Sequence, residues 1–95
     1  MKVSNKAIDL GLVRRAKAGD YQAFDLLVLK YQSRLISTAF RFVKDVHIAE
    51  DLVQESFIKS FNSLASFRED SSFYTWIYRI TVNTSKNFLV SKKRK

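Results

Sequence analysis

The sequence predicts an all-α domain, a compact bundle of four helices, from three observations. The 95 residues include no proline and only two glycines, so the chain has little of the turn chemistry that β-hairpins require. Its apolar residues recur at spacings of three and four, which is the period of amphipathic helices. Hydrophobic residues make up 46% of the chain, which at this length supports one modest core and not two. We therefore expect a single helical domain.

The first half of the chain is expected to form two helices. One runs from about Ala7 to Ala18, because Gly19 readily adopts the left-handed conformation that ends helices. The second runs from about Tyr21 to Val43, with Asp20 as its N-cap. The apolar stripe of this second helix consists of Phe24, Leu27, Val28, Tyr31, Leu35, Ala39 and Phe42. Its length and wide apolar surface predict that it is the central helix of the bundle.

The second half is expected to form two more helices joined by a loop. The third helix spans about Ile48 to Leu64. Its buried residues are expected to be Ala49, Leu52, Val53, Phe57, Phe61 and Leu64. The segment 66–71, which is polar except for Phe67, then interrupts the helical pattern, and Asp70 or Ser71 is expected to cap a fourth helix. This helix continues to about Val90.

The charge of the chain indicates a nucleic-acid partner. Formal net charge is +8, and the sequence pI is about 10. After Asp70 there is no acidic residue, while five aromatic residues and six lysines or arginines follow. Cations attract a polyanion, and aromatic rings stack on bases that have left a duplex. The chain ends in the basic residues 92–95, which are typical of the start of a linker, so the domain itself is expected over residues 1–91.

Composition argues against several other classes of function. With no cysteine, the chain has no disulfides, thiolate zinc sites or cysteine nucleophiles. It has neither a signal peptide nor an apolar run that could span a bilayer, so we expect no membrane insertion and a cytoplasmic location. His47 is the only histidine and is expected at the surface. Glu50, Asp51 and Glu55 come from one segment, whereas a divalent-cation site usually draws carboxylates from several. We expect no cofactor and no enzymatic activity.

One side of the third helix carries acids and amides around a single apolar residue. This acid–amide face consists of Asp51, Gln54, Glu55, Ile58 and Asn62. Glu55 is placed to pair with Lys59, four residues later. The face has two interpretations from the pattern alone, a solvated surface with one stray isoleucine or a docking surface for a basic partner helix. Both stay open.

The fourth helix places cationic and amide side chains opposite its apolar stripe. Trp76 sits where the two sides meet, so its indole can pack inward and still offer a face to a base. Asn83 is either a neutral surface amide or a group that hydrogen-bonds a base edge, with Arg79 and Lys86 on phosphates. Phe67, in the preceding loop, either walls a pocket for one extruded base or acts as a hydrophobic staple; composition favours the staple.

Several motifs together resemble region 2 of bacterial sigma factors. They are residues 19–24 with Tyr31, residues 49–59, residues 67–68 and residues 73–83. The resemblance is strongest to the extracytoplasmic-function group and its envelope-stress sigma-E branch, and it extends from about Leu10 to Val90. Ordered motifs of this length are far more specific than any short pattern. The resemblance implies a sigma-2 domain whose third and fourth helices are joined by a recognition loop, residues 65–72, called the 65–72 loop below.

The resemblance implies two binding surfaces. The acid–amide face is implied to dock on the clamp helices of the largest catalytic subunit of core RNA polymerase. The other surface is implied to recognise the −10 promoter element as single-stranded non-template DNA and to help open the duplex. Carried over to this chain, that candidate DNA face consists of Lys59, Ser63, Leu64, Phe67, Arg68, Tyr74, Trp76, Arg79, Ile80, Asn83, Lys86 and Asn87. Family members usually have an anti-sigma factor as a further partner.

This chain departs from the sigma-factor pattern in two respects. Primary sigma factors have a pair of tryptophans where this chain has Trp76-Ile77, which implies weaker melting and stricter promoter choice. The sigma domain that reads the −35 element is absent from these residues, so the chain resembles the first half of a longer protein. Two other hypotheses are a polymerase-independent, helix-turn-helix DNA-binding regulator, which prefers duplex, and an acid-dependent nuclease, which needs magnesium.

Overall fold

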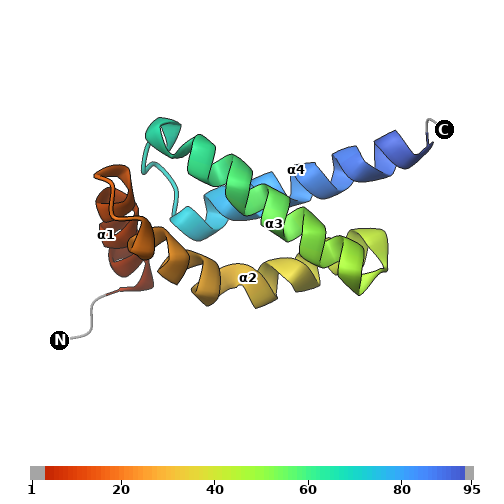
Figure 1. The fold of residues 1–95 in the computed structure, drawn as a ribbon, viewed down its shortest axis with the longest axis horizontal. Helices are drawn as coiled ribbons and strands as arrows, with labels where there is room; N and C mark the ends of the chain where they lie inside the picture. The colour runs from red at the N-terminus through yellow and green to blue at the C-terminus, as the bar shows by residue number, and fades with distance from the viewer. Residues whose placement is uncertain (1–3, 94–95) are drawn as a thin grey trace.

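The computed structural model describes residues 4–93, which form four α-helices and one short 3-10 helix (Figure 1). These are α1 (Asn5–Lys17), α2 (Tyr21–Val43), α3 (Val46–Asn62), η1 (Leu64–Ser66) and α4 (Phe73–Lys93). Residues 4–93 contain no β-strand. The predicted all-α, four-helix class is therefore confirmed.

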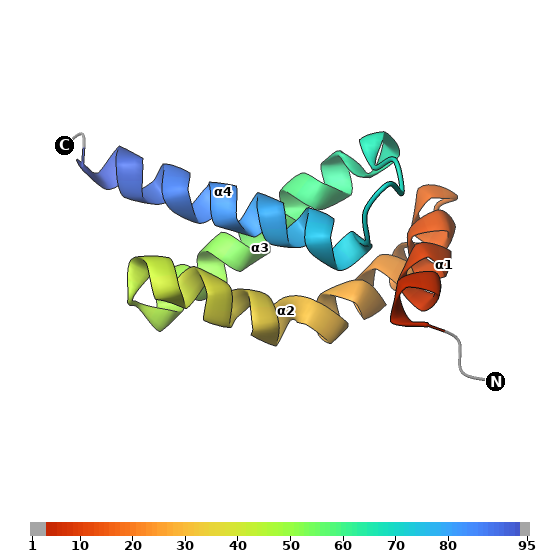
Figure 2. The ribbon, with the colours of Figure 1, turned by 180° about the vertical axis from the view of Figure 1, so that it is seen from behind.

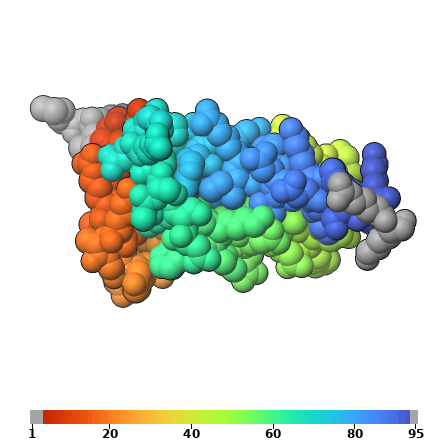
Figure 3. Space-filling view, turned by 90° about the horizontal axis from the view of Figure 1, so that it is seen from above, coloured from red at the N-terminus to blue at the C-terminus, as the bar shows by residue number. Residues whose placement is uncertain are grey.

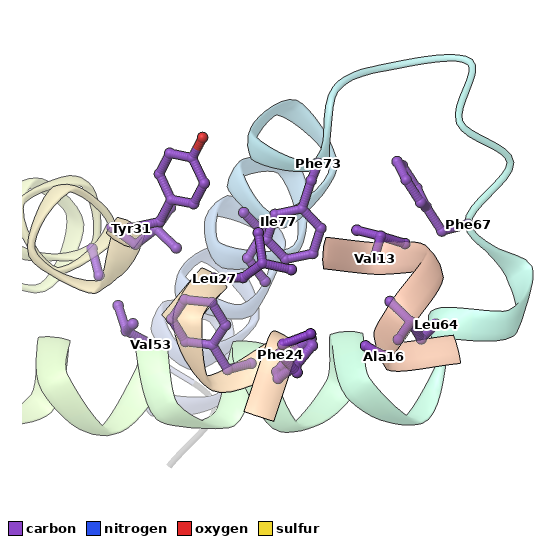
Figure 4. Close-up of a cluster of buried hydrophobic side chains, with 14 of the residues drawn as sticks. Val13, Ala16, Phe24, Leu27, Tyr31, Val53, Leu64, Phe67, Phe73 and Ile77 are labelled. Atoms are coloured by element: carbon purple, nitrogen blue, oxygen red, sulfur yellow. The ribbon is translucent and has the colours of Figure 1, made fainter. Parts of the chain in front are cut away.

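The central position predicted for α2 is also confirmed, because α2 packs against α1, α3 and α4. α3 and α4 cross over it, and α1 lies across the end of the bundle where α4 begins (Figures 1 and 2). The buried aromatic and aliphatic side chains meet between the helices (Figure 4). Phe24 and Phe73 lie with their ring centroids 6.3 Å apart in an edge-to-face arrangement, which joins α2 to α4 at the centre of this core.

The first two helix boundaries follow from local chemistry. α1 begins earlier than predicted because Ser4 caps it, with its hydroxyl 3.1 Å from the Ala7 amide that donates to it. Gly19 has φ 104°, so it ends α1 in the left-handed region as predicted. The predicted N-cap position of Asp20 is confirmed, but the side-chain hydrogen bond expected there is absent. Asp20 stands at the N-cap position, but its carboxylate binds Arg15, with Nη2–Oδ2 at 2.7 Å, and makes no cap hydrogen bond.

The boundaries of α3 and α4 differ from prediction for similar reasons. α3 starts two residues early because the Asp45 carboxylate accepts hydrogen bonds from the amides of His47 and Ile48. α4 is capped by Ser72, not by Asp70 or Ser71, since the Ser72 hydroxyl accepts from the Thr75 amide at 3.1 Å.

The C-terminal ends of α3 and α4 also differ from the prediction. α3 ends at Asn62, and the chain then tightens into η1 over Leu64–Ser66. α4 continues to Lys93, so the first two residues of the predicted basic tail are helical, where cations near a helix C-terminus are favourable. Arg94 and Lys95 lie outside the described residues.

One buried charge fixes α1 to α2. Asp9 is 1% exposed, and its carboxylate accepts a hydrogen bond from the Tyr31 hydroxyl. The same carboxylate forms an ion pair with Lys30, whose Nζ lies 2.8 Å from Oδ1. Burial raises the pKa of Tyr31, and the neighbouring Asp9 carboxylate raises it further. A buried carboxylate that has both partners is tolerated, whereas loss of either leaves it inadequately compensated.

Candidate nucleic-acid and protein interfaces

The exposed side of α4 carries the polar and cationic residues that the sequence predicted there. Arg79, Asn83, Lys86 and Asn87 are all exposed, and Trp76 and Ile80 are partly exposed beside them. α4 and the 65–72 loop form one continuous surface with α1 at its end (Figure 3). Positive charge and amide groups on one surface are what a single strand needs for backbone and base contacts.

Phe67 is not an open wall of this surface. It is 3% exposed, and its ring is directed from the loop towards Val13 of α1 (Figure 4). Its ring centroid lies 4.8 Å from that of Trp76 and 6.4 Å from that of Phe73. These contacts match the hydrophobic-staple interpretation, because the ring holds the entry to α4 against the core. Leu64, 5% exposed, is buried in the same core.

Tyr74 lies apart from the other residues of the candidate DNA face. Its ring packs on α2, with the Tyr31 ring centroid at 5.0 Å and the Arg34 guanidinium carbon at 4.2 Å from the ring centroid. Trp76 instead packs towards Phe67 and the loop. Since residues 74 and 76 are two positions apart on a helix, they point about 200° apart around it. The structure therefore does not bring Tyr74 together with Trp76.

Lys59 joins the two predicted surfaces. Its amine lies 2.8 Å from the Glu55 carboxylate, which confirms the predicted ion pair within α3. The same amine donates to the Thr84 hydroxyl of α4 at 3.3 Å. This contact fixes the register of α3 against α4, two helices that run in opposite directions (Figure 1).

The acid–amide face is exposed along its whole length. Asp51, Gln54, Glu55 and Asn62 are all exposed, and Ile58 among them is 56% exposed. His47 is exposed at the start of the same helix, as predicted, and lies 3.5 Å from the Glu50 carboxylate. An isoleucine left in water on a folded domain favours the docking interpretation, although a single exposed apolar residue is common.

Sequence reasoning missed an apolar groove between α2 and α3. The groove has a volume of about 670 Å³. Its lining includes Tyr21, Val28, Ile36, Ile58 and Phe61. Phe61, predicted to be buried, is 38% exposed, because it packs its edge against Phe24 and leaves one side open to the groove. The groove adjoins the acid–amide face, since Gln54 and Ile58 belong to both.

The groove was hidden in the sequence because its two walls come from different helices. Val28 and Ile36 are at helical spacing with the buried residues of α2, so they were indistinguishable from core positions. A continuous apolar hollow bordered by charge is typical of a site that receives an amphipathic helix.

Comparison with known proteins assigns the chain to a family. Residues 27–95 match the family described as Sigma-70 region 2. The chain belongs to the Sigma-70 region 2 family. The resemblance predicted from its motifs is confirmed.

Two curated relatives place this sigma region 2 chain near the sigma-E branch. The RNA polymerase sigma-H factor of Pseudomonas aeruginosa is 53% identical over 87 residues, which cover 92% of this chain and 45% of the relative. The ECF RNA polymerase sigma-E factor of Escherichia coli strain K12 is 48% identical over 93 residues, covering 98% of this chain and 48% of the relative. The chain thus spans about half the length of the curated relatives that it matches.

A solved structure has the same fold. It is the NMR structure of an engineered region 2 of sigmaE in complex with GTAAAA, with a TM-score of 0.85 and 44% identity to this chain. The alignment covers 97% of this chain and 96% of that one. In the part of the sigma region 2 domain that the structure describes, residues 4–93, no group of three or more acidic, histidine or cysteine side chains is arranged to hold a metal ion. Across that same range, no helix is long and apolar enough to span a membrane.

Proposed function

We propose that this domain is the promoter-recognition module of a sigma factor. It binds core RNA polymerase and recognises the −10 element as single-stranded non-template DNA, and it has no catalytic activity of its own. Membership of the Sigma-70 region 2 family supports the proposal, as do relatives named RNA polymerase sigma factors. The solved relative that has the same fold is a complex with GTAAAA. The domain acts in the cytoplasm, where polymerase and promoters are found.

The observation that carries the proposal is the separation of two chemically different surfaces. The α4 surface is cationic and rich in amides, whereas the acid–amide face of α3 is exposed beside an apolar groove. A polyanion and a basic partner helix can therefore be bound at the same time. A sigma factor needs this arrangement, because it holds DNA while it is attached to polymerase.

The DNA role proposed for each side chain is supported by its chemistry and its exposure. Asn83 hydrogen-bonds a base edge, because an exposed amide offers both a donor and an acceptor. Arg79 and Lys86, exposed on the same helix, bind phosphates. The extruded base lies over the exposed Ser63 at the end of α3, and the buried Phe67 packs the adjoining loop against the core.

The DNA half is tested with fluorescently labelled single strands and duplexes. A random single-stranded pool first selects the preferred −10 sequence, and GTAAAA serves as the starting probe. We expect single strands to be preferred to duplex and affinity to fall steeply with salt. Asn83→Ala is expected to reduce discrimination against the wrong base by about fivefold or more. Asn62→Ala, an exposed amide on the other face, is the matched control.

A phosphate contact behaves differently in the same titrations. Lys86→Ala is expected to weaken all sequences alike and to lower the salt slope by about 0.7 for a single strand. Equal affinity of the wild type for every single strand would contradict base recognition. A preference for duplex would instead favour the polymerase-independent regulator, and magnesium-dependent cleavage would reveal a nuclease.

For binding to polymerase, we propose that the clamp helices of the largest polymerase subunit cover the acid–amide face and the adjoining groove. Asp51→Lys with Glu55→Lys is expected to abolish binding to core polymerase while single-strand binding is kept or improved. Ile58→Glu tests the apolar part, and Val90→Glu adds the same charge at another exposed apolar position, far along α4. Equal polymerase affinity of these last two variants would remove the groove from the interface. An anti-sigma factor that covers the same groove would compete with polymerase.

A further inference from the structure

Two cations of α1 bind the 65–72 loop, although they are about fifty residues from it in sequence. Arg14 holds the Glu69 carboxylate with two contacts, Nη2–Oε1 at 2.7 Å and Nε–Oε2 at 3.4 Å. The paired geometry restricts both side chains more than a single contact does. The Arg14 guanidinium lowers the pKa of the Glu69 carboxyl, so this group is charged at neutral pH.

The second cation binds the loop backbone. Lys17 Nζ donates to the Phe67 carbonyl oxygen at 2.9 Å, in a partly buried position. The same amine lies 5.9 Å from the centroid of the Phe67 ring. Because the acceptor is a backbone carbonyl, this contact fixes the path of the chain where it leaves η1.

The loop between these contacts is held in an unfavourable conformation. Glu69 has φ 63°, in the left-handed region that residues other than glycine adopt infrequently. Such a conformation persists when surrounding contacts determine it. With residues 67 and 69 fixed towards α1, the side chain of Arg68 between them is exposed. Figure 3 shows the loop in contact with α1 on one side and α4 on the other.

We propose that Arg14 and Lys17 are positioning residues that set the base selectivity of the 65–72 loop. The inference rests on the proposed function, because it concerns the loop that faces the extruded base. A loop fixed at two points presents one shape to a base, whereas a mobile loop adapts to several and discriminates less. Selectivity therefore depends on a helix that has no contact with DNA in this scheme.

The experiment compares variants that lose one contact each. Arg14→Ala removes the pair with Glu69, and Lys17→Met keeps the aliphatic stem but removes the amine. The matched control is Arg15→Ala, on the same helix. The Arg15 side chain is exposed to a similar extent, 60% against 67% for Arg14, but it pairs with Asp20 and not with the loop. All three variants lose one positive charge, so non-specific attraction to DNA falls equally.

Loop fixation is measured first, without DNA. Trp76 is the only tryptophan and packs on Phe67, so its fluorescence reports how the loop is held. Amide hydrogen exchange of residues 66–70 gives a second measure. We expect faster exchange and altered Trp76 emission in the Arg14 and Lys17 variants and no change in the Arg15 control. Unchanged exchange in both variants would overturn the inference.

Selectivity is then measured as the ratio of affinities for the selected single strand and for the same strand with one base changed. Arg14→Ala and Lys17→Met are each expected to lower the ratio by about two- to fivefold. The Arg15 control is expected to weaken both strands equally. The charge exchange Arg14→Glu with Glu69→Arg is expected to restore the ratio, which recovery of stability alone would not explain.

The experiment distinguishes failure of the proposed function from failure of the inference about Arg14 and Lys17. A wild type that does not discriminate between strands refutes the proposed function and the inference with it. A selective wild type whose ratio survives both substitutions refutes the inference alone, even if loop exchange becomes faster. A lowered ratio in the Arg15 control would also overturn it, because general charge would then explain the effect.

Discussion

Replacing Phe67 distinguishes a core residue from a DNA contact. The ring is 3% exposed and packs on Trp76 and Phe73. An aromatic side chain buries about 150–250 Å², which at about 25 cal/mol per Å² corresponds to about 4–6 kcal/mol. Phe→Ala substitutions in cores cost about 3–5 kcal/mol, and we expect Phe67→Ala to fall in that range. For a small domain with a total stability of about 5–15 kcal/mol, this is a large fraction.

The assay is thermal unfolding followed by circular dichroism, together with single-strand binding well below the melting temperature. At about 4–8 °C per kcal/mol, Phe67→Ala is expected to lower Tm by at least about 12 °C. Phe67→Leu, which keeps most of the apolar volume, is expected to cost less and to keep strand selectivity. Phe61→Ala, at a position with 38% exposure, is a second comparison and is expected to lower Tm less. If Phe67→Ala melted within about 3 °C of the wild type and lost strand selectivity, the ring would belong to the DNA site and the packing argument would be wrong.

Three further predictions concern pH and backbone conformation. Burial raises the pKa of Tyr31, so its contribution to stability is present below pH about 10 and is lost as pH rises; urea unfolding from pH 8 to 11 is expected to show this loss in the wild type and less of it in Tyr31→Phe. Arg14 lowers the pKa of Glu69, so the stabilisation from the Arg14–Glu69 pair is present above pH about 4.3 and is lost as pH falls, while the contact of Lys17 with the Phe67 carbonyl stays; Trp76 emission in acid titrations of wild type and Arg14→Ala checks this. Gly19→Ala is expected to destabilise by about 1 kcal/mol because φ is 104°, whereas Gly11→Ala, inside α1 with open space around it, is expected to stabilise by about 0.5–1 kcal/mol; opposite shifts in Tm test both.

Helix type and the main exposed faces could be predicted from sequence because they depend on local periodicity. α2 has the predicted bounds, and the acid–amide face is exposed as its spacing on α3 indicated. Caps were less predictable, since several polar residues compete for each position. Asp20 occupies the predicted N-cap position of α2, yet its carboxylate pairs with Arg15 and does not bind the helix amides. Asp70 and Ser71 were as suitable as Ser72 until the path of the loop decided among them.

The candidate site was predictable only in part. Arg79, Asn83 and Lys86 lie on one exposed side because a single helix carries them, and helical geometry fixes their relation. Tyr74 was placed in the same set, but Arg34 and Tyr31 of α2 hold its ring elsewhere. Such a contact joins residues about forty positions apart, so no local pattern contains it.

The sequence by itself determined the helices, the basic and aromatic segment after Asp70 and the family, because each depends on the order and spacing of the residues. Tertiary structure decided what those residues face. It buried Phe67, opened a groove beside Ile58, and brought Arg14 and Lys17 to a loop about fifty residues away. The physical reason is that burial and ion pairing depend on distances through space, and these exist only after the helices have packed against one another.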